Sequence, residues 1–190
     1  MRDRATKSGV ACVSGSVIRQ HRAVMEARYG RAAVERALRR LATDDRELIE
    51  RALPIVWIPI RIQEEFYGAL AEETGKPVDE LHTDIAREST ARNLRTLWRV
   101  LLRFTSDNAL IARAPIFFAK SYSRGRLCAE LEAPGKVRIT LNGWPDVPEL
   151  SLRGLRIGIE TVLSEAGRQQ VCVTSERAPD GAELRASWQV

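Results

Sequence analysis

The residues that could carry catalytic or metal chemistry are few in this chain, and they lie far apart. There are two histidines, His21 and His82, and three cysteines, Cys12, Cys128 and Cys172. A structural zinc site normally takes four nitrogen or sulfur ligands and a catalytic zinc site takes three, at spacings that these residues do not offer. Both histidines lie in polar helical stretches, so we expect them to be exposed to solvent. We therefore expect no catalytic residue, no bound metal and no cofactor.

The usual nucleophile and nucleotide motifs do not occur either. The sequence has no Gly-x-Ser-x-Gly elbow, no P-loop and no Gly-x-Gly-x-x-Gly turn. Adjacent carboxylates such as Glu64 and Glu65 point in different directions on a helix, which is typical of solvated side chains. Cys128 and Cys172 both fall on the polar phase of predicted strands, so they could be neighbours on one face of a sheet. They could form a reactive pair, or they could simply be two small, half-buried side chains without a chemical role.

Charge is distributed unevenly along the chain. The 190 residues carry 30 basic and 25 acidic side chains, a formal charge of +5. Residues 1–53 hold 12 basic and 7 acidic residues, so they carry the whole excess. Such a segment favours an anionic partner, although a solvated surface is the simpler interpretation.

The 44% of apolar residues is typical of a globular chain. No apolar run approaches the ~20 residues that span a bilayer. Cys12 comes too early for the cleavage site of a signal peptide, so we expect a cytoplasmic protein with reduced thiols.

Residues 78–104 form the longest helical pattern, with an apolar stripe on one face. The opposite face carries an arginine ridge, Arg92, Arg95, Arg99 and Arg103. We consider this ridge a binding surface for an acidic protein partner or a lipid surface, or else a solvated face whose arginines pair with nearby glutamates. No aromatic side chains interleave with the arginines and no helix-turn-helix pattern accompanies them, so we do not expect nucleic acid.

Helical periodicity fills the first half of the chain, and alternation with period two fills the last third. We predict helices over residues 17–43, 44–53, 61–74 and 107–118, with a mostly extended connector between Pro54 and Pro59. We predict strands over 127–132 and 137–142, a helix over 152–167, and strands around 171–173 and 184–188.

These elements predict an α+β fold, in which a helical N-terminal half packs on a four-stranded antiparallel sheet with strand-strand-helix-strand-strand order at the C-terminus. We expect one domain over residues 1–190, with a mainly helical half (1–125) and a ββαββ half (126–190).

Bulky side chains cluster where the predicted helices meet the predicted sheet. They are Trp57, Phe66, Trp98, Phe104, Phe117, Phe118 and Trp188. A cleft between a twisted sheet and splayed helices is a natural site for a small apolar ligand. The alternative is a fully packed core, which is the usual state of protein interiors.

The order of elements resembles a ligand-binding superfamily that includes vinyl-reductase-type sensor domains, heme-NO-binding-related folds and the small subunits of the TRAPP vesicle-tethering particle. More closely, the chain resembles a paralogous family of unknown function found in myxobacteria. The matching phrases are Leu53-Pro54 to Trp57-x-Pro59, Leu101-x-x-Phe104-x-Ser106, Tyr122-x-x-Gly125, Leu152-x-Gly154 and Glu160-x-x-Leu163-x-x-x-Gly167.

The departures from these relatives matter for function. The cysteines that vinyl-reductase-type sensors place after Glu176 are replaced here by Ala178, Pro179 and Leu184, so that metal site should be absent. Heme-binding relatives carry a proximal histidine and a Tyr-x-Ser-x-Arg signature, but the run from Tyr122 to Arg126 has the wrong spacing and no histidine beside it.

Our first hypothesis is a non-catalytic sensor or adaptor domain that holds a small apolar ligand, a protein partner, or both. A purely protein-interacting scaffold subunit similar to the TRAPP components is the second, and an enzyme of unrecognised chemistry is the third. We further expect a homodimer formed through helices of the first half, because two-fold oligomers are the commonest.

Overall fold

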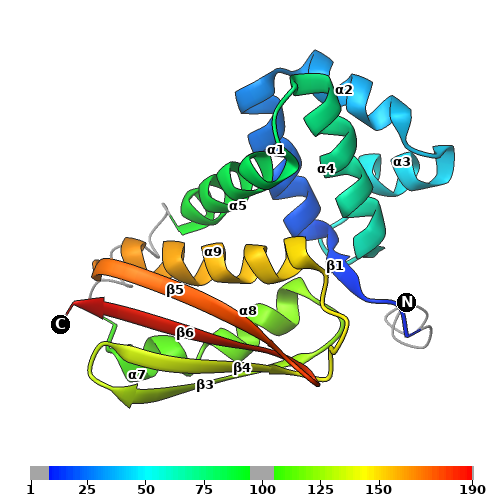
Figure 1. Cartoon of the computed structure of the whole chain (residues 1–190). Coiled ribbons are helices and arrows are strands. Elements are labelled where there is room, and N and C mark those ends of the chain that lie inside the picture. Colours follow the sequence, from blue (N-terminus) through cyan, green and yellow to red (C-terminus); the bar gives the residue numbers. More distant parts are fainter. Residues whose placement is uncertain (1–8, 95–104, 190) are drawn as a thin grey trace. The chain divides into compact units, whose positions relative to one another are not determined.

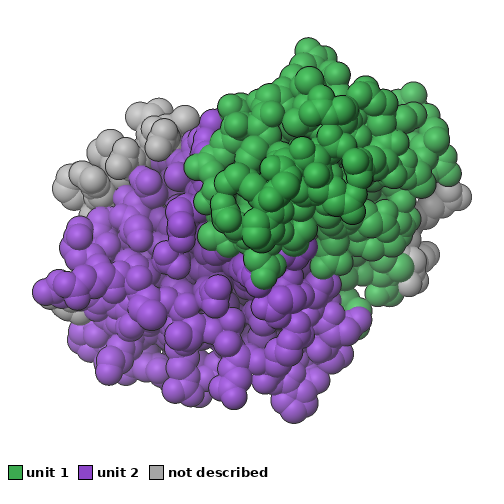
Figure 2. All heavy atoms as spheres, turned by 45° about the horizontal axis from the view of Figure 1, so that its top comes forward, with its two compact units in different colours: residues 1–85, 120–124 green, residues 86–119, 125–190 purple. Residues whose placement is uncertain are grey.

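The structure is a computed structural model, and it describes residues 9–94 and 105–189. The chain divides into two compact units (Figure 2). Unit 1 comprises Met1–Ile85 with Lys120–Arg124, and unit 2 comprises Ala86–Ala119 with Gly125–Val190. That the two units form one domain stays a prediction.

Unit 1 is built from helices and one small sheet. Its elements are β1 (Cys12–Ser14), α1 (Gly15–Tyr29), α2 (Arg31–Arg40), α3 (Thr43–Glu50), β2 (Trp57–Pro59), α4 (Ile60–Thr74) and the first half of α5 (Val78–Leu94). The connector predicted between the two prolines contains β2, which pairs antiparallel with β1. This two-stranded sheet was not predicted, because strands of three residues are too short to show a periodic pattern.

Glycines set two of the boundaries in unit 1. The single helix predicted over residues 17–43 is wrong, because Gly30 adopts a φ of 83° between α1 and α2. This left-handed region favours glycine, and it breaks the helix between two amphipathic segments. Gly75 ends α4 in a left-handed conformation with a φ of 66°, as predicted.

The core of unit 1 forms where α2 and α4 pack together. Buried apolar side chains include Val34 and Leu38 from α2 and Ile62, Phe66 and Leu70 from α4. Ion pairs cross the same helices at the surface, where Arg36 and Arg40 of α2 bind Glu73 of α4.

Unit 2 contains the four-stranded sheet. Its elements are α7 (Asp107–Ile111), α8 (Ala114–Ser121), β3 (Arg126–Ala133), β4 (Lys136–Asn142), α9 (Glu149–Glu165), β5 (Gln169–Ala178) and β6 (Gly181–Gln189). The strand order is β3-β4-β6-β5 and every neighbouring pair is antiparallel. The predicted α+β fold class, with a helical N-terminal half and a four-stranded antiparallel C-terminal sheet, is confirmed.

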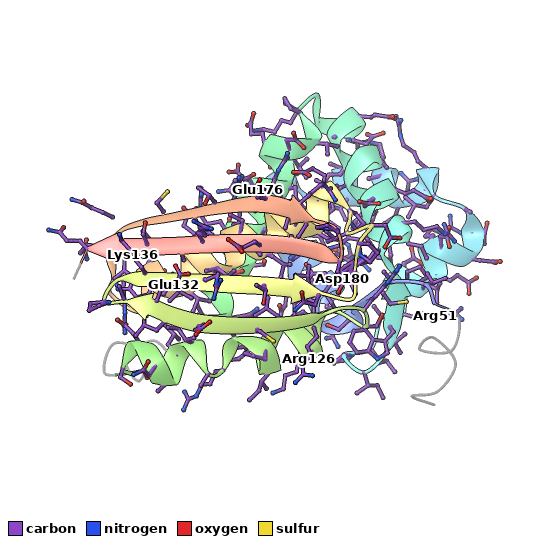
Figure 3. The ribbon with its side chains drawn as sticks, turned by 60° about the horizontal axis from the view of Figure 1, so that its bottom comes forward. Arg51, Arg126, Glu132, Lys136, Glu176 and Asp180 are labelled. Atoms are coloured by element: carbon purple, nitrogen blue, oxygen red, sulfur yellow. The ribbon has the colours of Figure 1, made fainter. Side chains whose placement is uncertain are left out.

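The sheet has one apolar and one polar face. Ile139 of β4 pairs with Ala129 of β3 and with Leu184 of β6, and helix α9 covers this apolar face along β5 and β6 (Figure 1). The opposite face carries charged side chains such as Glu132, Lys136 and Glu176 (Figure 3). This face carries both acidic and basic side chains, which is typical of the solvated face of an antiparallel sheet.

No helix in the described parts of the chain is long and apolar enough to cross a membrane.

Candidate functional site

The residues predicted to line an apolar pocket lie in both units. Trp57 in β2 is half-buried and Phe66 in α4 is buried, both within unit 1. Phe118 in α8 and Trp188 in β6 are buried within unit 2, whereas the side chain of Phe117 is 52% exposed. The remaining two, Trp98 and Phe104, lie outside the described residues. The predicted pocket therefore stays a prediction.

Only one arginine of the predicted ridge lies within the described residues. Arg92 is exposed near the end of α5, and its guanidinium forms an ion pair with Glu88 one turn earlier. The other three, Arg95, Arg99 and Arg103, lie outside the described residues. The role of the ridge in partner binding also stays a prediction.

A polar cluster inside unit 1 was missed by the sequence analysis. The Tyr67 hydroxyl lies 2.8 Å from Nδ1 of His21, and the Gln63 amide nitrogen lies 3.3 Å from the same atom. The ring of His82 packs edge-on against Tyr67, with 4.9 Å between the ring centroids. The cluster joins α1, α4 and α5. We define these four side chains as the histidine–tyrosine cluster.

The expectation that both histidines are exposed is wrong. His82 is only 4% exposed and His21 is half-buried. Burial, together with the neighbouring His82, lowers the pKa of His21 to about 3. Burial also raises the pKa of Tyr67 well above its usual value, with Tyr122 and Tyr29 adding to the effect.

These pKa shifts fix the roles in the hydrogen bond. A neutral phenol donates, so the Tyr67 hydroxyl donates to Nδ1 of a neutral His21. The proton of the His21 ring is then on Nε2, because the partner of one ring nitrogen sets the tautomer of the other. The hydrogen-bonded pair of His21 and Tyr67 is therefore uncharged at neutral pH.

The sequence contained one signal for this cluster. Gln63 and Tyr67 stand four residues apart, so they share one face of α4 with its apolar residues. Two polar side chains within an apolar stripe need hydrogen-bond partners in the core. The partner helices, however, meet α4 only through tertiary packing.

The cysteines do not form a reactive pair. Cys12 is buried, and burial raises the pKa of its thiol. Cys128 and Cys172 are exposed on the polar face of the sheet, but they lie in β3 and β5, which are its two opposite edge strands. Across residues 9–94 and 105–189, no three His, Cys, Asp or Glu side chains gather as metal ligands would.

The fold is α+β, with a helical unit that contains the histidine–tyrosine cluster and a unit that contains the four-stranded sheet. No family model and no curated protein matches the chain. Solved structures of H-NOX proteins match it over nearly its whole length, at low sequence identity. The shared feature is therefore the fold.

Three of these structures illustrate the match. An oxygen-binding H-NOX domain related to soluble guanylate cyclases, in its oxygen complex, has a TM-score of 0.68 at 14% identity, covering 93% of this chain and 95% of its own. The unliganded Fe(II) H-NOX protein of K. algicida has a TM-score of 0.67 at 9% identity, covering 93% and 97%. A protein studied for the effect of porphyrin distortion on heme redox potential has a TM-score of 0.66 at 14% identity, covering 92% and 99%.

These matches correct the resemblance inferred from the sequence. The assignment to a myxobacterial paralogous family near the vinyl-reductase-type and TRAPP proteins is wrong, because no family model matches and the solved structures are H-NOX proteins. The quoted motifs are short and spread along the chain, and motifs of this kind do not establish a family.

The H-NOX fold implies a heme, so the donor set must be tested against one. Heme iron is held in proteins by histidine, cysteine thiolate, methionine or tyrosine. Both histidines of the chain are in the histidine–tyrosine cluster: Nδ1 of His21 accepts a hydrogen bond, and the ring of His82 is buried against Tyr67. Residues 95–104 contain none of the four residue types.

The remaining donors are in the wrong state or the wrong place. The raised pKa of Cys12 keeps it a thiol, and burial raises the pKa of Tyr122 to about 12, so its side chain stays a phenol. Cys128 and Cys172 lie on the exposed face of the sheet, and Met25 is fully buried in the core of unit 1. These residues do not fit a heme.

Proposed function

We propose that the chain is a non-catalytic sensor or adaptor domain, which uses the H-NOX fold to hold a small apolar ligand other than heme and to signal to a protein partner. The observation that carries this proposal is the correspondence of fold over more than nine-tenths of both chains, with a donor set unsuited to iron. One of the matching proteins is an oxygen-binding domain related to a cyclase, so this fold can serve ligand detection.

The protonation states in unit 1 support a role without catalysis. A general acid or base works best with a pKa near the operating pH. In the histidine–tyrosine cluster both pKa values are shifted away from neutral pH. The pKa of His21 is about 3, and that of Tyr67 lies far above its usual value. Neither group exchanges a proton readily near neutral pH. The cluster stabilises a structure rather than activating a substrate.

An apolar ligand is supported by the large uncharged side chains that each unit contains by itself. Trp57 and Phe66 are in unit 1 and Phe118 and Trp188 are in unit 2, and none of the four carries a charge. Aromatic side chains contribute large apolar areas, and binding sites for apolar ligands are lined mainly by such groups. The ligand class that we propose is a fatty-acyl or aromatic molecule.

Heme-based sensing is the second candidate, and the observation that favours it is that the solved structures named above are all H-NOX proteins. A titration of the purified chain with hemin separates the two candidates. We expect no saturable, one-to-one change in the visible spectrum, and the same trace for His21→Gln and His82→Gln. A saturable spectrum that His82→Gln abolishes would establish heme binding and overturn our proposal.

We also propose that the domain works as a homodimer and that the arginine ridge binds an acidic protein partner. Light scattering at tens of micromolar protein tests the dimer, and a monomer at that concentration would contradict it. The ridge predicted from the sequence implies that replacing Arg95 and Arg99 with Glu should abolish partner binding while leaving thermal stability nearly unchanged.

A further inference from the structure

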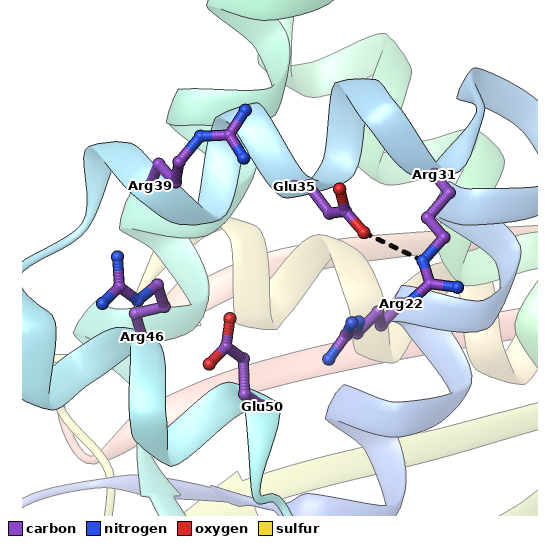
Figure 4. A pocket seen from close by; sticks show the side chains of 6 residues that line it. All are labelled: Arg22, Arg31, Glu35, Arg39, Arg46 and Glu50. Carbon is purple, nitrogen blue, oxygen red and sulfur yellow. Dashed lines mark hydrogen bonds and ion pairs between the residues drawn. The ribbon is translucent and has the colours of Figure 1, made fainter.

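A polar pocket opens between α1, α2 and α3 of unit 1. Its volume is about 450 Å³. The pocket is lined by Arg22, Arg31, Glu35, Arg39, Arg46 and Glu50, whose side chains surround it in Figure 4. This set of residues is separate from the histidine–tyrosine cluster and from the predicted apolar pocket.

Two of the arginines are held by glutamates. Nε of Arg22 lies 2.8 Å from a carboxylate oxygen of Glu26, and Nε of Arg31 lies 2.9 Å from one of Glu35. Both pairs join residues four apart on one helix. These pairs hold the two guanidinium groups at the rim and neutralise their charge.

The other two arginines have no such partner. Arg39 comes from α2 and Arg46 from α3, and neither guanidinium group forms an ion pair or hydrogen bond with any residue in 9–94 or 105–189. The same holds for the carboxylate of Glu50. The pocket thus contains two uncompensated guanidinium groups from different helices, with one carboxylate beside them (Figure 4).

The charge of the pocket matches the charge of its surroundings. Four arginines and two glutamates line it, and Glu26 pairs with one of these arginines, so the formal charge of the pocket together with this partner is +1. It lies within residues 1–53, the segment that carries the whole +5 excess of the chain. A concave surface with one sign of charge concentrates anions of the opposite sign.

The geometry points to a binding site for a phosphate monoester carried on a hydroxyl-bearing body, such as a sugar phosphate. A phosphate monoester carries a charge of about −2 at neutral pH, so the net positive charge of the pocket attracts it. Guanidinium groups bind phosphate oxygens in a bidentate manner, as Arg39 and Arg46 are free to do. Glu50 accepts hydrogen bonds, so it selects for the hydroxyl groups of the body.

The lining also excludes other small anions. Among the described residues, no aromatic side chain lines the pocket, so a nucleotide base has nothing there to stack on. No apolar side chain of the described residues lines it either, so an acyl chain gains nothing there. The volume lies within the range of small-molecule sites, about 300–1,000 Å³, and exceeds what one inorganic phosphate fills. The phosphate and a polar body are both needed to occupy it.

Isothermal titration calorimetry of the full chain tests this site. The probes are glucose 6-phosphate, inorganic phosphate and glucose. We expect saturable one-to-one binding of glucose 6-phosphate, weaker binding of phosphate and none of glucose. Arg39→Gln and Arg46→Gln should each weaken binding by about tenfold or more, because each removes a charge-assisted hydrogen bond.

Arg51→Gln is the matched control. It removes the same charge from the same segment, but Arg51 pairs with Glu47 and does not line the pocket, so we expect less than about a twofold change. Glu50→Gln removes the carboxylate beside the two arginines, so it should strengthen the binding of inorganic phosphate. It should also make the affinities for glucose 6-phosphate and for inorganic phosphate more alike. No heat with any probe at millimolar concentration, or an equal loss with Arg51→Gln, would overturn the proposal. Binding only of an acidic or phosphorylated peptide would also overturn it, in favour of a macromolecular partner.

Discussion

The histidine–tyrosine cluster makes a prediction about stability against pH. The pKa of His21 is about 3 in the folded chain, against an ordinary value of 6.5. Below pH 6.5 the unfolded chain takes up a proton on this histidine and the folded chain does not. The contribution of His21 to the free energy of unfolding is therefore fully present above pH 6.5, and it is lost as the pH falls toward 3.

The size of the effect follows from proton linkage. A complete difference of one proton changes the free energy of unfolding by about 1.4 kcal/mol for each pH unit. Because His21 is half-buried, with some water contact remaining, we expect a slope of about 1 kcal/mol per unit. When the pH falls from 6.5 to 4.5, this one side chain should lower the free energy of unfolding by about 2 kcal/mol.

The assay is urea unfolding followed by far-ultraviolet circular dichroism at several pH values, for the wild type and for His21→Gln. The glutamine keeps an oxygen that can accept from the Tyr67 hydroxyl, but it does not titrate. Carboxylates also titrate in this range, and the difference between the two proteins cancels their contribution. Equal pH slopes in the two proteins, or a steeper slope in the variant, would refute the reasoning.

Three further predictions concern stability and reactivity. Gly15→Ala should destabilise the chain by about 3 kcal/mol, since the added methyl would lie 2.2 Å from a backbone carbonyl oxygen. Gly68 has open space around it, so Gly68→Ala should stabilise the chain by about 0.5–1 kcal/mol. Thermal unfolding of both variants measures the two effects. Arg168→Ala should lower the free energy of unfolding by about 3 kcal/mol, because this nearly buried guanidinium binds a carboxylate at 2.6 Å and two backbone carbonyls. The exposed Arg51 is the control, and Arg51→Ala should lower it by less than about 0.5 kcal/mol. Equal losses in urea unfolding would refute the distinction. A thiol reagent should label the two exposed cysteines of the sheet quickly and Cys12 only after unfolding, so rapid labelling of all three in the folded chain would contradict its burial.

The sheet was predictable because each strand has one buried and one exposed face. Leu127 alternates with Cys128 and Val137 with Arg138, and this alternation alone sets which side faces the core. The break at Gly30 was not predicted, since amphipathic segments continue on both sides and only the backbone conformation reveals the turn.

The functional features were harder to predict because they combine residues from different helices. His21 and His82 are 61 positions apart and lie among polar residues, so their burial follows only from the packing of α1 and α5 around Tyr67. The arginine pocket likewise combines Arg39 and Arg46 from two helices, although the charge of residues 1–53 did indicate an anionic partner. The match to H-NOX proteins, at 9–16% identity, is visible only as a fold.

Native mass spectrometry of the freshly purified chain, with organic extraction of the same sample, tests the central claim most directly. The proposal predicts a complex heavier than the chain alone, which releases a fatty-acyl or aromatic molecule and no heme. A complex that releases heme would contradict the proposal in favour of a heme sensor. A bare chain mass would contradict it in favour of a domain that only binds other proteins.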